Sequence, residues 1–374
     1  MKQKKTLFIL LLISVSLVFS CISFFHGQDT KTGFALPALE NSNSWTMVLI
    51  PDPQTYMKFK RNQVIFHSMM QWIKMQKENL NIGLVLCVGD LVEQNALDKP
   101  DGINGDQTGT EQWKASKAAF RQLDGVLPYI LCTGNHDYGI SNSETRETQF
   151  PDYFNVTDNS LVDPVKNGIL KGMCKNAQGN RTLENAYYEF ISPLGRKFLI
   201  FSLEWSPRNE VVFWADSIAN MKKYEDHIAT LLTHSYLDSD NERLLTNPYP
   251  KYLNALDTNS GEDLWFKLIK PNGIFQFVVA GHVANSDDHA GQVGFRTDKN
   301  IAGKDVHQML FNAQREGGGW HGNGGDGWLR LLEFSADGTV HVQTFSPYLW
   351  SKEETRDRAW RKMEIDDFTF RLSF

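Results

Sequence analysis

Short apolar runs recur along the chain, and several of them stop abruptly at polar side chains. Each run is short enough to be one buried strand, and the residues that follow it can donate or accept hydrogen bonds or bind a metal ion. The junctions are Ile50 to Gln54, Val88 to Asp90, Cys132 to Asp137, Thr233 to His234 and Ala280 to His282. Sites in open α/β sheets are built at the carboxyl ends of strands, so the pattern predicts one site assembled from distant segments.

Amphipathic helical patterns separate the first three runs. One apolar stripe follows residues 62–77, and a second, with Ala119, Phe120 and Leu123 inward, follows residues 112–123. A strand at 45–50, a strand at 82–88 and a strand at 128–133 complete the alternation. Strand, helix and strand in this order predict right-handed crossovers and a parallel sheet.

The second half of the chain changes character. Residues 139–185 are a long polar excursion, typical of a lid or an insertion. A hairpin is expected over 186–191 and 197–204, then a helix at 210–223, strands at 228–233 and 274–280, and a short helix at 263–270. After residue 290 the pattern favours strands without helices, at 306–312, 328–334, 339–345 and 368–374. Ser335 to Gly338 is a good hairpin turn between two of them.

The N-terminus is expected to lie outside the fold. Lys2, Lys4 and Lys5 precede an apolar run at 7–19 that is too short to span a membrane comfortably, which indicates a secretory signal over residues 1–20. Cys21 resembles a bacterial lipoprotein site, although Phe19 is bulky for that pattern, so lipid anchoring and simple cleavage both stay open. Residues 21–44 are expected to be a leader and 45–374 a single catalytic domain. We therefore expect a periplasmic, cell-surface or secreted protein.

Composition changes this picture little. The net charge of -6 over 374 residues gives no electrostatic reason to expect a nucleic-acid partner. Cys87, Cys132 and Cys174 are too few and too scattered for a disulfide framework.

The polar residues at the strand ends are carboxylate, amide and imidazole groups: Asp52, Asp90, Asn135, His234 and His282. Such a mixture suits Mn, Fe, Zn or a similar divalent ion. A carboxylate shared by two ions can hold them roughly 3.5–4 Å apart, activate a bridging water and stabilise an in-line displacement at phosphorus.

These junctions, taken in order, resemble the calcineurin-like metallophosphoesterase superfamily. The resemblance covers residues 45 to about 285, and Gly134-Asn135-His136-Asp137 is its most specific part. It implies an α/β fold in which two mixed sheets pack as a sandwich flanked by helices, with metals at the strand ends.

The resemblance also implies roles for individual residues. Asp90 would bridge two metals, Asp52 would bind the first, and Asn135, His234 and His282 would complete the second. His136 would face the phosphate and either stabilise its charge or protonate the leaving oxygen. Asp137 would orient the imidazole of His136.

The chain departs from the family pattern at the first metal. Gln54 and Ala284 stand where the family usually has histidines. An amide oxygen is a weaker and harder ligand, and alanine offers none; Asn285 or His289 could stand in. We therefore expect one or two ions, drawn from Mn, Fe, Zn and Mg, with weaker binding at the first position or a preference for harder ions such as Mn or Mg there.

Two functions follow from these observations. One is an extracytoplasmic phosphoesterase that hydrolyses a phosphomonoester or phosphodiester through metal-activated hydroxide. The other is a catalytically degenerate, metal-stabilised binding protein, against which the non-ligand His136 argues. The absence of an arginine near Gly89-Asp90 makes a protein phosphatase less favoured.

Two further features stay open on the sequence alone. Glu93 is either a partner of the metal ligands or an exposed loop carboxylate. Arg315, Trp320 and His321, in or beside the Gly-rich loop 317–327, either contact substrate or form a plain surface turn.

Overall fold

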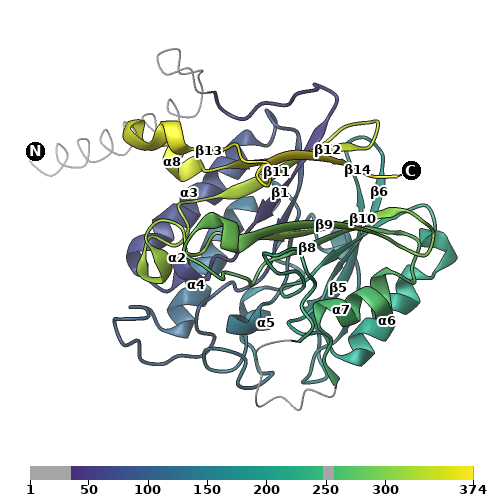
Figure 1. Ribbon diagram of the computed structural model, residues 1–374. Coiled ribbons are helices and arrows are strands. Elements are labelled where there is room, and N and C mark those ends of the chain that lie inside the picture. The colour runs from purple at the N-terminus through teal and green to yellow at the C-terminus, as the bar shows by residue number, and fades with distance from the viewer. Residues whose placement is uncertain (1–34, 247–256, 374) are drawn as a thin grey trace, which may run out of the picture.

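The computed structural model describes residues 35–246 and 257–373 (Figure 1). The predicted signal peptide and Cys21 lie outside the described residues. Among those that are described, no helix is long and apolar enough to cross a membrane.

Two mixed sheets form the centre of the molecule, as predicted. The first sheet has the order β13-β12-β11-β1-β2-β3, with β14 paired to β12, and the second has the order β4-β5-β6-β7-β8-β10-β9. The strands of the first sheet are β1 (Trp45–Ile50), β2 (Ile82–Cys87), β3 (Tyr129–Leu131), β11 (Leu329–Phe334), β12 (Thr339–Phe345), β13 (Trp360–Arg361) and β14 (Asp367–Arg371). Those of the second are β4 (Leu170–Lys175), β5 (Arg181–Ile191), β6 (Lys197–Ser202), β7 (Ile228–Leu232), β8 (Phe275–Ala280), β9 (Val293–Lys299) and β10 (Asp305–Phe311).

Apolar side chains from both sheets meet in one core. The ring of Trp45 in β1 lies 4.6 Å from Phe334 of its own sheet and 5.4 Å and 5.8 Å from Phe190 and Phe198 of the other. These contacts bury large aromatic surfaces between the sheets and hold the sandwich together.

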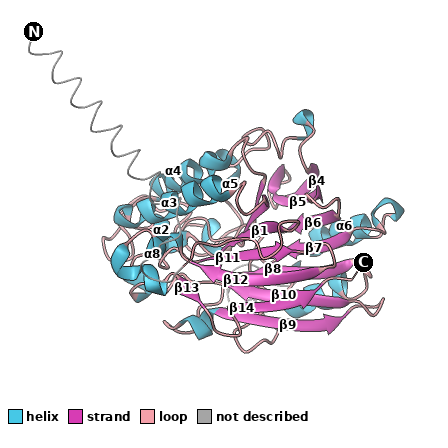
Figure 2. Ribbon diagram, turned by 90° about the horizontal axis from the view of Figure 1, so that it is seen from above, coloured by secondary structure: helices cyan, strands magenta, loops and turns pink. Residues whose placement is uncertain are grey.

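Helices cover both outer faces. The helices are α2 (Gln54–Met57), α3 (Lys60–Gln76), α4 (Gly109–Phe120), α5 (Phe150–Tyr153), α6 (Asn209–Ala219), α7 (Gly261–Leu264) and α8 (Pro347–Trp350). The apolar stripe of α3, including Phe66 and Ile73, belongs to the main core, whereas Val212 of α6 and Leu264 of α7 pack in a second core against the other sheet. Figure 2 shows α3 and α4 on one side of the strands and α6 on the other.

Several predicted boundaries were wrong. The excursion 139–185 contains α5 and β4. Strand β4 pairs with β5, but Leu170 is its only buried residue, so no apolar pattern marked it. Strand β9 was missed because only its first two residues, Val293 and Gly294, are buried. The helix expected at 263–270 is α7 followed by a π-helical turn, Trp265–Ile269.

Parallel pairing places the junctions at one edge. Strands β1, β2 and β3 run parallel with Ile50 beside Cys87 and Cys87 beside Leu131. Strands β7, β8 and β10 are likewise parallel, with Leu232 beside Val279. Both sheets therefore end their strands in polar residues on the same side of the molecule.

Candidate metal centre

Four donor groups from four strand ends converge at this edge. The Asn135 Oδ1 atom lies 3.1 Å from His234 Nε2 and 2.9 Å from His282 Nδ1. The Asp90 Oδ2 atom lies 3.1 Å from the same nitrogen of His234. Donor atoms of Asp90, His234 and His282 all fall within 4.8 Å of one another, a spacing that one ion could bridge. We call these four residues the cage.

Contacts behind the cage fix which atom of each residue faces it. The ring of His234 donates Nδ1–H to the carbonyl of Val88, 2.8 Å away, which leaves Nε2 for a ligand. The Asn135 amide donates to Asn142 Oδ1 at 2.8 Å, so its carbonyl oxygen is turned inward. Cage residues with this support need little rearrangement to bind an ion.

Asp52 sits beside the cage and is held by two donors. Its Oδ2 atom accepts from the backbone N–H of His282 at 3.0 Å and from Asn312 Nδ2 at 2.8 Å. Its Oδ1 atom is buried and has no hydrogen-bond donor among the described residues. Asn312 was missed, although it ends an apolar run in the same way as the predicted ligands.

Gln54 repeats this arrangement. Its Nε2 donates to Glu93 Oε2 at 3.0 Å, and its Oε1 is buried without a donor in the described part of the chain. Unsatisfied buried oxygens cost free energy, and a bound cation would satisfy both of these, which belong to residues two positions apart in the sequence. The residues present therefore suit a second ion next to the cage.

Glycines of the motifs make room for ligands from other motifs. A Cβ on Gly134 would lie 2.1 Å from Asp90 Oδ1, and a Cβ on Gly281 would lie 2.1 Å from Asp52 Oδ1. Asp90 and His282 themselves have φ of 49° and 72°, the left-handed region that non-glycine residues seldom adopt. Such strain concentrates at functional sites.

His136 faces the cage, but Asp137 does not orient it. The His136 ring donates Nδ1–H to the backbone carbonyl of Glu93 at 2.7 Å, and its backbone N–H donates to Asp90 Oδ1. The Asp137 carboxylate instead accepts from the N–H groups of Gly134 and Val92, at 2.8 Å and 3.1 Å. The predicted role of Asp137, orienting the imidazole of His136, was therefore wrong. Its side chain folds back onto backbone N–H groups and does not reach the neighbouring ring.

The cage concentrates buried charge. Burial raises the pKa of Asp52 to about 8, an effect that His234 opposes and Asp90 reinforces. Burial would also raise the pKa of Asp90, but His234 and His136 beside it lower that pKa to about 2. Burial and the neighbouring His234 lower the pKa of His282 to about 3, which favours the neutral ring that a metal requires.

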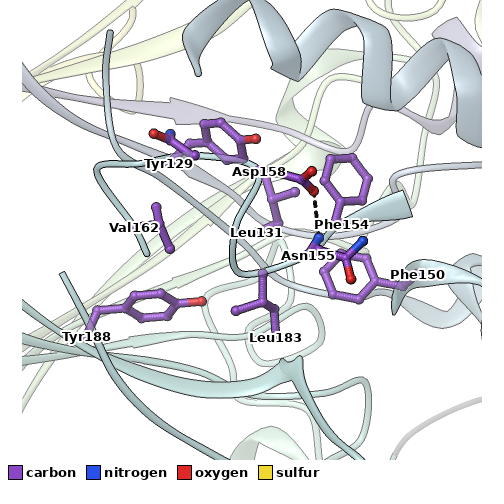
Figure 3. A pocket seen from close by; sticks show the side chains of 10 residues that line it. Tyr129, Leu131, Phe150, Phe154, Asn155, Asp158, Val162, Leu183 and Tyr188 are labelled. Atoms are coloured by element: carbon purple, nitrogen blue, oxygen red, sulfur yellow. Dashed lines mark hydrogen bonds between the residues drawn. The ribbon is translucent and has the colours of Figure 1, made fainter. Parts of the chain in front are cut away.

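A cleft of about 640 Å³ opens onto the cage. Asp90, Asn135, His136 and His282 form its floor, and Arg315 and Trp320 form part of its wall. Trp320 lies 6.3 Å from the His136 ring, whereas His321 turns toward Phe59. A second hollow, of about 20 Å³, is lined by apolar side chains such as Phe150, Phe154 and Tyr188, and none of the predicted site residues lines it (Figure 3).

Neither proposed substitute replaces the missing imidazole. The Asn285 amide donates to Asp238 Oδ1 at 2.6 Å at the exposed rim of the cleft. His289 is buried elsewhere, with Nε2 2.6 Å from Asp366 Oδ1. The position of Ala284 therefore has no side-chain donor from either residue.

Three comparisons show which known proteins this chain is similar to. The model of the calcineurin-like phosphoesterase family matches residues 48–286. A protein of Bacillus subtilis (strain 168), described as the uncharacterized protein YvnB, is 29% identical over 313 residues, which are 82% of this chain and 20% of that protein. The chain thus spans about a fifth of the length of this relative. The structure titled GAP50, the anchor in the inner membrane complex of Plasmodium, overlaps with a TM-score of 0.42 and 11% identity, covering 89% of this chain and 90% of that one.

Proposed function

We propose that this chain, which belongs to the calcineurin-like phosphoesterase family, hydrolyses a phosphate monoester or diester outside the cytoplasm with the help of a divalent cation. The observation that carries the proposal is the convergence of Asp90, Asn135, His234 and His282, in which both imidazoles contact the Asn135 oxygen and His234 also contacts the Asp90 carboxylate. Oxygen and imidazole donors in this mixture suit Mn, Fe or Zn.

Two sets of side chains would bind the two ions. The cage would hold one ion, and the free oxygens of Asp52 and Gln54, together with Asp90, would hold the other. A divalent cation held there would lower the pKa of a water molecule and polarise the phosphoryl oxygen. Because Gln54 supplies a neutral oxygen, the first position favours Mn or Mg.

His136 would either stabilise the charge of the substrate phosphate or protonate the leaving oxygen. Its Nδ1 is occupied by the Glu93 carbonyl, so Nε2 is the atom available to the leaving oxygen or the phosphate. Burial alone would lower the pKa of His136, but the charges of Asp90 and Glu93 raise it, which favours the proton-donating form. Asp137 supports this role indirectly, by holding the turn that presents His136.

The cleft supports a substrate larger than inorganic phosphate. Arg315 offers a cation and Trp320 an aromatic face beside His136. Trp320 is fixed in place, because its Nε1–H donates to Asn104 Oδ1 at 2.9 Å and the Lys58 ammonium lies 3.9 Å from its ring centre. Location outside the cytoplasm is supported by the basic and apolar start of the sequence, and lipid attachment at Cys21 is the alternative to simple cleavage.

Hydrolysis of an aryl phosphate and a bis-aryl phosphate, each with Mn, Mg, Zn, Fe or Ca, tests the proposal. We expect turnover with at least one ion and a loss of roughly 10²–10⁴-fold in His136→Ala with metal content unchanged. His67→Ala is the matched control, because it also removes an imidazole, but His67 lies on α3, contacts Gln122 and belongs neither to the cage nor to the cleft lining. No turnover with any ion would favour the binding-protein alternative, and full activity in His136→Ala would overturn the role of that residue.

A further inference from the structure

Glu93 is a buried carboxylate in the loop after β2 that no motif explains. Only 2% of its surface is exposed, which decides against the exposed loop carboxylate that the sequence left open. Its Oε2 atom accepts from Gln54 Nε2 at 3.0 Å, and its Oε1 accepts from Asn104 Nδ2 at 3.2 Å. The ammonium of Lys58, 4.0 Å from Oε2, balances its charge.

The chemistry of a carboxylate dictates how Gln54 is oriented. An ionised carboxylate only accepts hydrogen bonds, so Gln54 must present its NH₂ group to Glu93. Its carbonyl oxygen then points away from Glu93. That oxygen is buried and lacks a donor among the described residues, as does Oδ1 of Asp52, two positions earlier in the sequence. A buried carbonyl with no donor is well suited to a cation.

The backbone of Glu93 makes a second contact, with His136. The backbone carbonyl of Glu93 accepts from His136 Nδ1–H at 2.7 Å. The loop that carries Glu93 is itself anchored, because its N–H donates to Gln112 Oε1 on α4 at 2.9 Å. Glu93 therefore contacts both Gln54, a proposed ligand of the first metal position, and the non-ligand His136.

We propose that Glu93 is a positioning residue that locks Gln54 as an oxygen donor to the cation at the first metal position, and so makes that position selective for hard divalent ions such as Mn or Mg. The inference rests on the proposed function only in assuming that the chain binds divalent ions. The Glu93 side chain acts on the metal through Gln54. The hydrogen bond from His136 to the Glu93 backbone carbonyl does not depend on the side chain and is kept when that side chain is substituted.

Binding of Mn to the purified, metal-free full chain tests the inference, with free Mn measured by electron paramagnetic resonance. The natural protein is expected to show one tighter and one weaker class of Mn. In Glu93→Gln the new side-chain amide can donate a hydrogen bond to the Gln54 oxygen, so the Gln54 amide group is free to turn over. The weaker class of Mn should then lose roughly 10–100-fold in affinity, while the tighter class stays unchanged. Gln54→Ala should weaken the same class, and the double variant should be no worse than Gln54→Ala, because both changes remove one interaction.

A matched control and a gain of function complete the design. Glu333→Gln alters another buried carboxylate, which accepts a hydrogen bond from the Ser44 hydroxyl and contacts none of the proposed ligands. It should leave the affinities of both Mn classes unchanged. Gln54→His offers an imidazole that can donate to Glu93 and bind metal through its other nitrogen, so it should raise Zn affinity relative to Mn. The two Gln54 variants keep Glu93 and carry the test if Glu93→Gln does not fold.

Four results would overturn the inference: a single class of Mn in the natural protein, an unmoved weaker class in Glu93→Gln or Gln54→Ala, additive effects in the double variant, or an unchanged Mn-to-Zn preference in Gln54→His. The proposed function can fail separately. Two Mn classes that respond as expected, without hydrolysis of either ester, would support the role of Glu93 and refute catalysis. Hydrolysis with an unmoved weaker class would do the reverse.

Discussion

Gly134→Ala is the smallest change that should disable the centre. Gly134 has φ of -106° and ψ of -176°, an extended backbone that alanine adopts freely, so the substitution carries no conformational penalty of its own. The difficulty is space. The added Cβ would lie 2.1 Å from Asp90 Oδ1 and 2.5 Å from the Asp90 backbone nitrogen.

The magnitude follows from these distances. Real Cβ atoms essentially never come within 3.0 Å of another heavy atom, so the Asp90 carboxylate must move by about 1 Å. Overpacking of this kind costs about 1–3 kcal/mol of unfolding free energy. Misplacement of a reacting group by about 1 Å can cost roughly 10²-fold in rate, and Asp90 belongs to the cage that would hold the ion. We therefore expect turnover to fall at least a hundredfold while the fold survives.

The assay combines Mn-dependent ester hydrolysis, metal content and thermal unfolding. Gly102→Ala is the control, since Gly102 has a positive φ but nothing within 4 Å of its added Cβ, and it should lose stability without losing metal. If Gly134→Ala kept turnover within threefold of the natural protein with full metal content, the steric account of this motif would be refuted.

Three further outcomes are expected. Adding Mn at about one hundred times its dissociation constant should raise the unfolding free energy by about 2.7 kcal/mol, which calorimetry with and without a chelator would detect; an unchanged melting temperature would count against a metal site. Burial, opposed by Glu93, lowers the pKa of Lys58 to about 8 from 10.5, so the folded chain binds fewer protons than the unfolded chain between these pH values. Stability owed to this group should therefore rise with pH across that window, and Lys58→Met, followed by chemical unfolding, should flatten the rise. Trp320→Ala should raise KM for aryl esters roughly two- to tenfold, the value of one aromatic contact, while His321→Ala, which alters a ring turned toward Phe59, should not.

Much of the fold was readable from local pattern. The apolar stripe of residues 62–77 became α3, and the hairpin at Ser335 to Gly338 joins β11 and β12, because helix period and turn chemistry are properties of neighbouring residues. Strands β4 and β9 escaped detection because few of their residues are fully buried, and backbone pairing by itself leaves no apolar signature.

Local pattern was enough to identify the side chains that stand at the strand ends, and strand pairing with sheet packing brings Asp90, Asn135, His234 and His282 together. Which atom of each residue faces the cage depends on contacts that form only in the folded chain. The carbonyl that holds His136 belongs to Glu93, and the amide that holds Asp52 belongs to Asn312, 260 positions away. Hydrogen-bond direction between such distant residues depends on where the packed sheets place them, and no spacing along the chain encodes that.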